Sequence, residues 1–179
     1  MKYVNLKLCH GWQSEWNANN LQRRETMNSV RVFRLQVPVN YDLEWAEAIR
    51  RGAPNTSESS LIWTVSDQFP TDKKGTVTES VFVTQLGPSF RHQAALNYAV
   101  AEKKPHAHPR VIWAIGECHP KLAREQGKNW MFLNSGLTCA VDGYVFVPFL
   151  VVLEDGLRGA DVYVVQCVFR ELSSCVFGE

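Results

Sequence analysis

The apolar run Val111–Ile115 constrains the fold of this chain more than any other segment. It contains five consecutive apolar residues, including β-branched and aromatic ones, and is bounded by Pro109 and Gly116. A short run of this kind, with no polar position, is typical of a strand covered on both faces, and such a strand lies centrally in a sheet. The sequence therefore predicts a central strand at 111–115 with a mostly buried Trp113.

Five further segments have the composition of strands. Each is rich in β-branched and aromatic residues or alternates apolar with polar positions, and turn residues separate them. The segments are 30–37, 61–65, 77–86, 144–153 and 162–169.

The spacing of these segments predicts how some of them pair. We expect 61–65 to pair with 77–86 across a long connection, and 144–153 to pair antiparallel with 162–169. Pro148 has no backbone N–H, so it predicts either a sheet edge or a bulge in its strand. A short helix is predicted at 120–127 and a short strand at 130–133.

Two longer segments have helix signals. In 42–51, Asp42 can cap the first turn, and basic residues followed by Gly52 mark the end. In 89–103, Ser89 can cap the helix and lysines precede Pro105. This order of elements favours an α+β fold, with a mixed, largely antiparallel sheet of about six strands and two main helices packed on it.

The length of the chain predicts one domain. At 179 residues, folding should bury roughly 70% of the surface that the unfolded chain exposes. Residues 1–28 are more polar than the rest and are interpreted as an N-terminal extension or linker, followed by a single α+β domain at 29–179. Trp12 and Trp16 are four residues apart in this extension and could share one face of a short docking helix.

The charge and cysteine content argue against several classes of protein. The net charge of +1 argues against a strong electrostatic grip on nucleic acid, which requires many basic groups. Five widely spaced cysteines, without a secretory signal, predict reduced thiols in a cytoplasmic protein. No segment approaches the ~20 apolar residues that span a bilayer, so no membrane association is expected.

Histidines and a cysteine gather on both sides of the 111–115 run. His106 and His108 lie on one side of an extended segment and are ligands that zinc accepts. However, His108 and Cys118 at opposite ends of a strand would be roughly 30 Å apart, and the CxxC pair common in structural zinc sites is absent. A zinc ion held partly by His106 and His108 is one hypothesis, and surface histidines in a Pro-flanked loop are the alternative.

Cysteine catalysis is a second hypothesis for the same region. Cys118 would follow the predicted strand and precede a helix whose amides lower its pKa. His119 is adjacent but faces elsewhere, so the base would be His92 or His106 arriving from another part of the fold. The alternative is that Cys118 is a small buried residue at the end of a strand.

Aromatic residues outside the periodic segments favour a binding function. Such residues often anchor interfaces with partner proteins, although they also close the edges of a domain. The residues in question are Trp12, Trp16, Phe69, Trp130 and Phe177. Because no catalytic motif is present, we expect a soluble binding or regulatory protein that acts through a protein interface, with a partner or as a homo-oligomer.

Nucleic-acid binding is the remaining alternative. Six arginines lie within the first 51 residues and could form a basic patch, in which Arg31 and Arg34 would lie on opposite faces of a strand. The arginines are Arg23, Arg24, Arg31, Arg34, Arg50 and Arg51.

Overall fold

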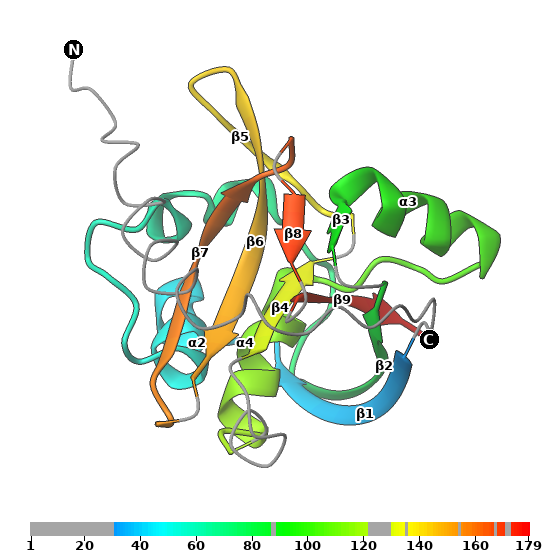
Figure 1. Ribbon diagram of the computed structural model, residues 1–179. Coiled ribbons are helices and arrows are strands. Elements are labelled where there is room, and N and C mark those ends of the chain that lie inside the picture. The colour runs from blue at the N-terminus through cyan, green and yellow to red at the C-terminus, as the bar shows by residue number, and fades with distance from the viewer. Residues whose placement is uncertain are drawn as a thin grey trace.

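The computed structural model describes residues 31–86, 89–121, 130–134, 136–153, 155–166, 168–170 and 173–179. Within these residues the chain forms a seven-stranded, mostly antiparallel sheet with three α-helices packed on it (Figure 1). The α+β prediction is therefore confirmed. The predicted extension at 1–28, with Trp12 and Trp16, lies outside the described residues, as does most of the predicted helix at 120–127.

The sheet has the order β1-β2-β9-β4-β6-β5, and β7 also pairs with β6. β4 and β9 run parallel, and the other pairs within this sheet are antiparallel. A separate two-stranded sheet joins β3 and β8. The strands are β1 Arg31–Asn40, β2 Thr76–Gln85, β3 Ser89–Arg91, β4 Trp130–Asn134, β5 Cys139–Val141, β6 Tyr144–Val152, β7 Arg158–Val164, β8 Val168–Arg170 and β9 Ser173–Gly178.

Most of the predicted strands are confirmed. The segments 30–37, 77–86 and 130–133 correspond to β1, β2 and β4. The antiparallel pair predicted from 144–153 and 162–169 is β6 with β7, although β7 begins at Arg158 and Val168–Arg170 is a separate strand. Alternation of apolar and polar residues identified β1, and β-branched and aromatic residues bounded by turn residues identified β6 and β7.

The position of Pro148 differs from both expectations. β6 is an inner strand, and Pro148 pairs with Val162 of β7 on one side. On the other side β4 pairs only with Phe149–Val152, and β5 only with Tyr144–Phe146. Pro148 therefore lies in the interval between β4 and β5, where neither strand pairs with it.

The three helices cover both faces of the sheet. α2 (Trp45–Gly52) and α4 (Pro109–Cys118) pack on one face, and α3 (His92–Ala101) packs on the other (Figure 1). Phe132 and Leu133 are neighbours in β4, and they belong to different clusters of buried residues, one on each side of the sheet. The sheet is consequently buried on both faces at its centre.

The prediction of a strand at 111–115 is wrong, because this run is the middle of α4. His108 accepts a hydrogen bond from the amide of Arg110 as the N-cap, and Pro109 takes the first helical position. Every residue from Val111 to Gly116 is buried, since α4 lies between α2 and the sheet. A helix that is apolar on all sides has no periodicity that distinguishes it from a buried strand. Trp113 is nevertheless buried, with 1% of its surface exposed, as the sequence predicts.

The prediction of a strand at 61–65 is also wrong. Leu61–Thr64 is a 3₁₀ helix, and the Ser60 hydroxyl caps it by accepting a hydrogen bond from the Ile62 amide. The Ile62 carbonyl accepts a hydrogen bond from the Trp45 indole at 2.7 Å, which ties this turn to α2. β2 therefore pairs with β1 rather than with 61–65.

The helices that were predicted at 42–51 and 89–103 are confirmed as α2 and α3, with shorter bounds. Asp42 does not cap α2, which begins at Trp45 after Glu44. The Asp42 carboxylate instead accepts a hydrogen bond from the Gly75 amide at 2.9 Å, so it links the end of β1 to the start of β2. Ser89 belongs to β3 rather than to the start of α3.

Candidate binding cleft

A cleft opens in the sheet beside β2. β1 pairs with β2 over its whole length, from Thr76 to Gln85. On the other side, β9 pairs only with Val81–Thr84. Within the described residues no strand pairs with this side of β2 from Thr76 to Ser80, so five residues of the strand have one free side.

The far wall of the cleft is the segment 105–108. The Gly178 amide donates a hydrogen bond to the Pro105 carbonyl at 2.8 Å, and His106 forms an antiparallel bridge with Phe177. β9 is thus bonded to β2 on one side and to this segment on the other. Glu179 follows Gly178 along the line of β9 and borders the cleft between these two walls.

Asn134 holds the segment 105–108 in place. Its side-chain amide donates a hydrogen bond to the Ala107 carbonyl at 2.6 Å, and its oxygen accepts hydrogen bonds from the amides of Gly136 and Leu137. Asn134 is fully buried, so water cannot reach its polar atoms, and these hydrogen bonds satisfy them instead. Gly136 has no side chain, and a Cβ there would overlap the His106 ring. The position of His106 therefore depends on both Asn134 and Gly136.

His108 closes the inner end of this wall. Its Nδ1 accepts a hydrogen bond from the Arg110 amide at 3.2 Å, which requires Nε2 to carry the proton in the neutral ring. Nε2 lies 3.1 Å from the Phe69 carbonyl and donates to it. Burial lowers the pKa of His108, which favours this neutral form. Both nitrogens have protein partners, so the ring is a helix cap.

Three polar side chains line the cleft on the α4 side of the sheet. The Tyr41 hydroxyl donates a hydrogen bond to Glu79 Oε1 at 2.8 Å, and Lys73 Nζ lies 2.5 Å from the same oxygen. Burial, with the Glu79 carboxylate as second cause, raises the pKa of Tyr41, so its hydroxyl keeps the proton that it donates. Because both donors contact Oε1, Glu79 retains acceptor capacity at Oε2 for a donor that enters the cleft.

A second polar group lies on the opposite face of β2. Arg34 Nε donates a hydrogen bond to the Ser80 hydroxyl at 3.0 Å, and its guanidinium pairs with the Glu179 carboxylate. Hydrogen bonds from Ser80 and Arg34 lower the pKa of Glu179, which stays ionised. These groups are exposed, so we expect them to contribute more to recognition than to stability.

The enclosed part of the cleft has a volume of about 240 Å³ and lies among Tyr41, Glu79, Ser80, His106 and Glu179. A neighbouring open depression has a volume of about 560 Å³. Lys73, His106 and His108 border both parts, and Thr71, Asp72 and Leu137 border the outer one. The lining is mostly polar and carries both signs of charge.

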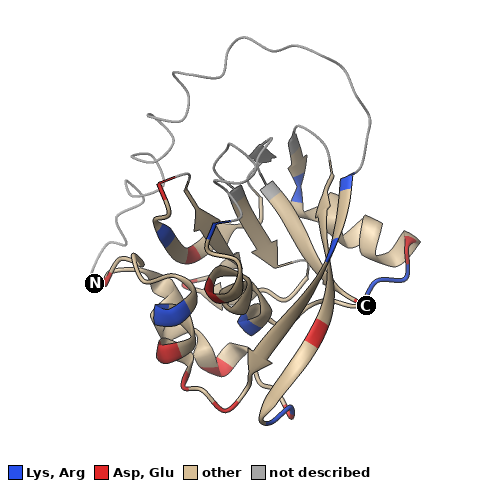
Figure 2. Ribbon diagram, turned by 90° about the horizontal axis from the view of Figure 1, so that it is seen from below, with Lys and Arg blue, Asp and Glu red and all other residues tan. Residues whose placement is uncertain are grey.

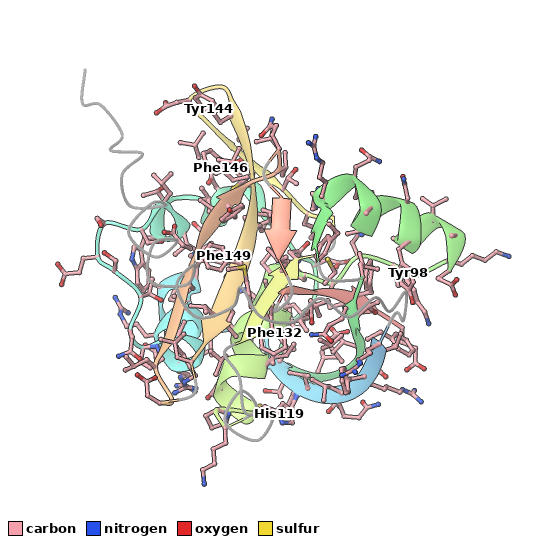
Figure 3. The ribbon with its side chains drawn as sticks, viewed as in Figure 1. Tyr98, His119, Phe132, Tyr144, Phe146 and Phe149 are labelled. Atoms are coloured by element: carbon pink, nitrogen blue, oxygen red, sulfur yellow. The ribbon has the colours of Figure 1, made fainter. Side chains whose placement is uncertain are left out.

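The structure does not bring the predicted cysteine site together. Cys118 is the last residue of α4, where the helix dipole disfavours a thiolate, and burial and Glu117 raise its pKa. His119 lies at the lower end of α4 in Figure 3. His92 begins α3, which belongs to the buried cluster on the other face of the sheet. Cys118 therefore lies at the carboxyl end of a helix, and not beside the amides of a helix start as predicted.

Among the residues that the structure describes, the predicted zinc site has no third ligand. Because 108–118 is helical, the separation of His108 and Cys118 is about 15 Å rather than 30 Å, still too long for one ion. Within the described ranges, no three His, Cys, Asp or Glu side chains are close enough to hold a metal ion. His106 instead lies near His92, whose pKa is lowered by burial and by the charge of His106.

The aromatic residues predicted to bind partners have different surroundings. Phe69 is buried and stacks on Trp45 with ring centroids 5.6 Å apart, and Phe177 is fully buried in β9, so both belong to the core. Trp130 begins β4, and its side chain lies outside the described residues. Loop position alone did not distinguish an interface aromatic from one that folds back into the core.

Of the arginines predicted to bind nucleic acid, the four that the structure describes lie on two separate elements. Arg31 and Arg34 lie on β1, whereas Arg50 and Arg51 lie on α2 and pair with Glu47. Arg23 and Arg24 lie outside the described residues. Basic and acidic residues are interspersed over the described part of the chain in Figure 2.

The main residues of the cleft were not found from the sequence. Tyr41 and Glu79 are 38 positions apart, and neither belongs to a motif. A weak signal was available: Glu79 breaks an otherwise apolar alternation of Val77, Val81 and Val83, which face the core. A carboxylate at an inward position of a strand needs a partner, and that requirement points to a polar site.

Comparisons with protein-family models, with curated proteins and with solved structures give no match to this chain. None of the helices in the described part of the chain is long and apolar enough to cross a membrane.

Proposed function

We propose that this protein is a binding protein that takes an extended segment of a partner protein in the cleft between β2 and 105–108. The observation that supports this function is the free side of β2 from Thr76 to Ser80, which faces a space in line with β9. An extended peptide can add to such an edge, where backbone hydrogen bonds provide affinity and side-chain pockets provide specificity.

The lining of the cleft indicates which segment would fit. Successive side chains of an inserted strand would alternate between the Glu79 side and the Ser80 side of the sheet. A volume of about 240 Å³ favours small side chains at these positions. Glu79 can accept a hydrogen bond at Oε2, so a donor such as a hydroxyl, amide or backbone N–H is favoured beside it.

The protein is proposed to act in the cytoplasm. Cys118, Cys139 and Cys175 are free thiols, which persist in a reducing compartment.

A peptide display library selected on the full-length protein tests the function. Ser80→Tyr fills the cleft without removing a backbone group, and Ser59→Tyr places the same side chain at an exposed position outside β2 that does not line the cleft. We expect Ser80→Tyr to weaken the selected peptides by more than about tenfold, equal to 1.4 kcal/mol, and Ser59→Tyr to leave their affinity unchanged.

Amide hydrogen exchange locates the bound segment independently. Alternate amides of 76–80 point away from β1 and should exchange rapidly in the free protein. The proposal predicts that a bound peptide slows their exchange. Selected peptides that bind equally to both tyrosine variants, or that protect other strands only, would show that the cleft is not the binding site.

A further inference from the structure

We propose that the Glu79 carboxylate and the Tyr41 ring form a binding site for one lysine side chain of the segment that enters the cleft, and that Lys73 occupies this site while the cleft is empty. This inference rests on the proposed function, because it names a side chain of the same segment. Lys73 would act as an internal competitor that the partner displaces.

The contacts of Lys73 show which chemistry the site accepts. Its Nζ lies 2.5 Å from Glu79 Oε1 and 5.4 Å from the centroid of the Tyr41 ring. A carboxylate and the face of an aromatic ring both attract a cation, and the attraction is stronger where water is partly excluded. Tyr41 is 5% exposed and the Glu79 side chain is 19% exposed, so the site meets this condition. It therefore favours a cation with N–H donors, as an ammonium group has.

The present occupant can leave the site at a small cost. The Lys73 side chain is 46% exposed, and an ion pair with an exposed partner contributes little to stability. Lys73 belongs to an exposed loop at 70–74 that forms no helix or strand. Both ends of this loop are hydrogen-bonded to the rest of the fold, at Phe69 and at Gly75. The Lys73 side chain can therefore withdraw while the ends of the loop stay in place.

Charge favours the exchange of one ammonium group for another. If Lys73 left without a replacement, the partly buried Glu79 carboxylate would lose its cation. If Lys73 stayed, it would repel a second ammonium group at the free Oε2 of Glu79. A lysine of the partner that replaces Lys73 avoids both costs. Backbone hydrogen bonds to β2 would then provide the affinity, and the lysine would provide the specificity.

Displacement of Lys73 also provides the space that a lysine needs. Lys73 borders both the enclosed cleft and the open depression beside it. A lysine of the inserted segment would take the place of its side chain. The residues on each side of that lysine would face the Ser80 side of the sheet, where small side chains remain favoured.

A five-residue peptide tests this inference on the full-length protein, with amide chemical shifts as the measure of binding. It has lysine at its centre, threonine and alanine elsewhere, and blocked ends, and the control peptide has norleucine in place of the lysine. We expect the wild-type protein to bind the lysine peptide at least about threefold more tightly. Glu79→Gln keeps an acceptor for the Tyr41 hydroxyl but removes the charge, so it should abolish this preference.

Lys73→Ala removes the internal competitor and should tighten the lysine peptide by about threefold or more. Lys74→Ala is the matched control, because it removes the same charge from the next residue, which is exposed and does not line the cleft. It should change the affinity by less than about twofold. In the wild-type protein, bound lysine peptide should also speed the acylation of Lys73, which enters solvent, and leave that of Lys74 unchanged.

The lysine site is overturned if the two peptides bind equally, if Lys73→Ala and Lys74→Ala have equal effects, or if the lysine peptide does not bind Lys73→Ala up to about 10 mM. Equal binding of both peptides that Ser80→Tyr abolishes would leave the proposed function in place without the lysine site. A lysine preference that needs Glu79 but is insensitive to Ser80→Tyr would support the lysine site and contradict the insertion of a strand. A norleucine peptide with a free amino terminus that binds as tightly as the lysine peptide would assign the site to an amino terminus instead.

Discussion

Gly52 and Gly116 lie against each other where α2 crosses α4. A Cβ on Gly116 would overlap the carbonyl oxygen of Gly52 and lie 3.1 Å from the Leu150 side chain. A Cβ on Gly52 would in turn lie 2.7 Å from the Cα of Trp113. The two helices approach this closely only because both positions lack a side chain, and the approach seats Trp113 in the core.

We expect Gly116→Ala to destabilise the protein by about 2 kcal/mol. The clash is with backbone, so its cost exceeds the gain of about 1 kcal/mol in helix propensity. Gly159→Ala is the control, because a Cβ there meets ordinary contacts at 3.8 Å, and it should change stability by less than about 1 kcal/mol. Urea unfolding of the two variants measures both values. Equal stability would show that α2 and α4 can separate without cost.

Trp113→Ala should reduce the free energy of unfolding by on the order of 3–5 kcal/mol, the range for a large buried aromatic. Its ring contacts Trp45 with centroids 6.1 Å apart, so the cavity would open between α4 and α2. Trp12→Ala should cost little, because Trp12 belongs to the predicted polar extension. Thermal unfolding of the two variants measures both losses of stability. A larger loss for Trp12→Ala than for Trp113→Ala would contradict the assignment of the extension.

Stability should fall at acid pH because of His108. The pKa of His108 is lowered in the folded protein by burial, whereas the unfolded chain binds a proton near pH 6.5. The unfolded state therefore holds more protons below about pH 6.5, so this stability is complete above that pH and is lost as the pH falls through the folded pKa.

The variant His108→Asn isolates this effect, since asparagine caps a helix without titrating. His92 also has a pKa lowered by burial and contributes in the same direction in both proteins. Urea unfolding between pH 7.5 and 5 should show a smaller loss for His108→Asn than for the wild type. Parallel curves would mean that His108 does not contribute.

Asn134→Ala should destabilise the protein by about 2–3 kcal/mol, because it leaves the Ala107 carbonyl and the amides of Gly136 and Leu137 without their buried partner. We also expect faster amide exchange in 105–108, which Asn134 holds. Denaturation and exchange measurements on the same variant separate the two effects. Unchanged exchange in 105–108 would show that β9 alone orders this wall of the cleft.

The three described cysteines should differ in how fast their thiols are alkylated. Cys118 is exposed, whereas Cys139 and Cys175 are buried. Burial raises the pKa of Cys139 to about 11 and also raises that of Cys175. Mass spectrometry after alkylation at pH 8 should find Cys118 modified first among the three, and more slowly than a free thiol because its own pKa is raised. Rapid alkylation of Cys118 at neutral pH would revive the catalytic hypothesis.

The sequence predicted those elements that carry a local signature in their own residues. β1 alternates from Leu35 to Val39, and α2 carries basic residues at its end, so local patterns were sufficient. The sequence did not predict α4 as a helix, because a helix that is buried on all sides has no alternation of apolar and polar residues. Its capping residue, His108, was considered as a metal ligand, although Pro109 at the first helical position was the local sign of a helix start.

The cleft could not be predicted because it depends on contacts between distant residues. Asn134 reaches Ala107, and Arg34 reaches Glu179, 145 positions away. None of these pairs has a local sequence signature. The predicted pair of His106 and His108 did lie at the cleft, but for a different reason: the segment between them forms a wall of the sheet.

The place of β9 determines how the sheet can assemble. It follows every other strand in sequence yet lies between β2 and β4, so it joins β1–β2 to β4–β6–β7. During synthesis at about 5–20 residues per second, the two parts can each form a local antiparallel unit, but the sheet stays divided until residues 173–178 have left the ribosome. Until then, the inner edges of β2 and β4 are both open to wrong pairing, which makes chaperone binding to the nascent chain an expected consequence of this topology.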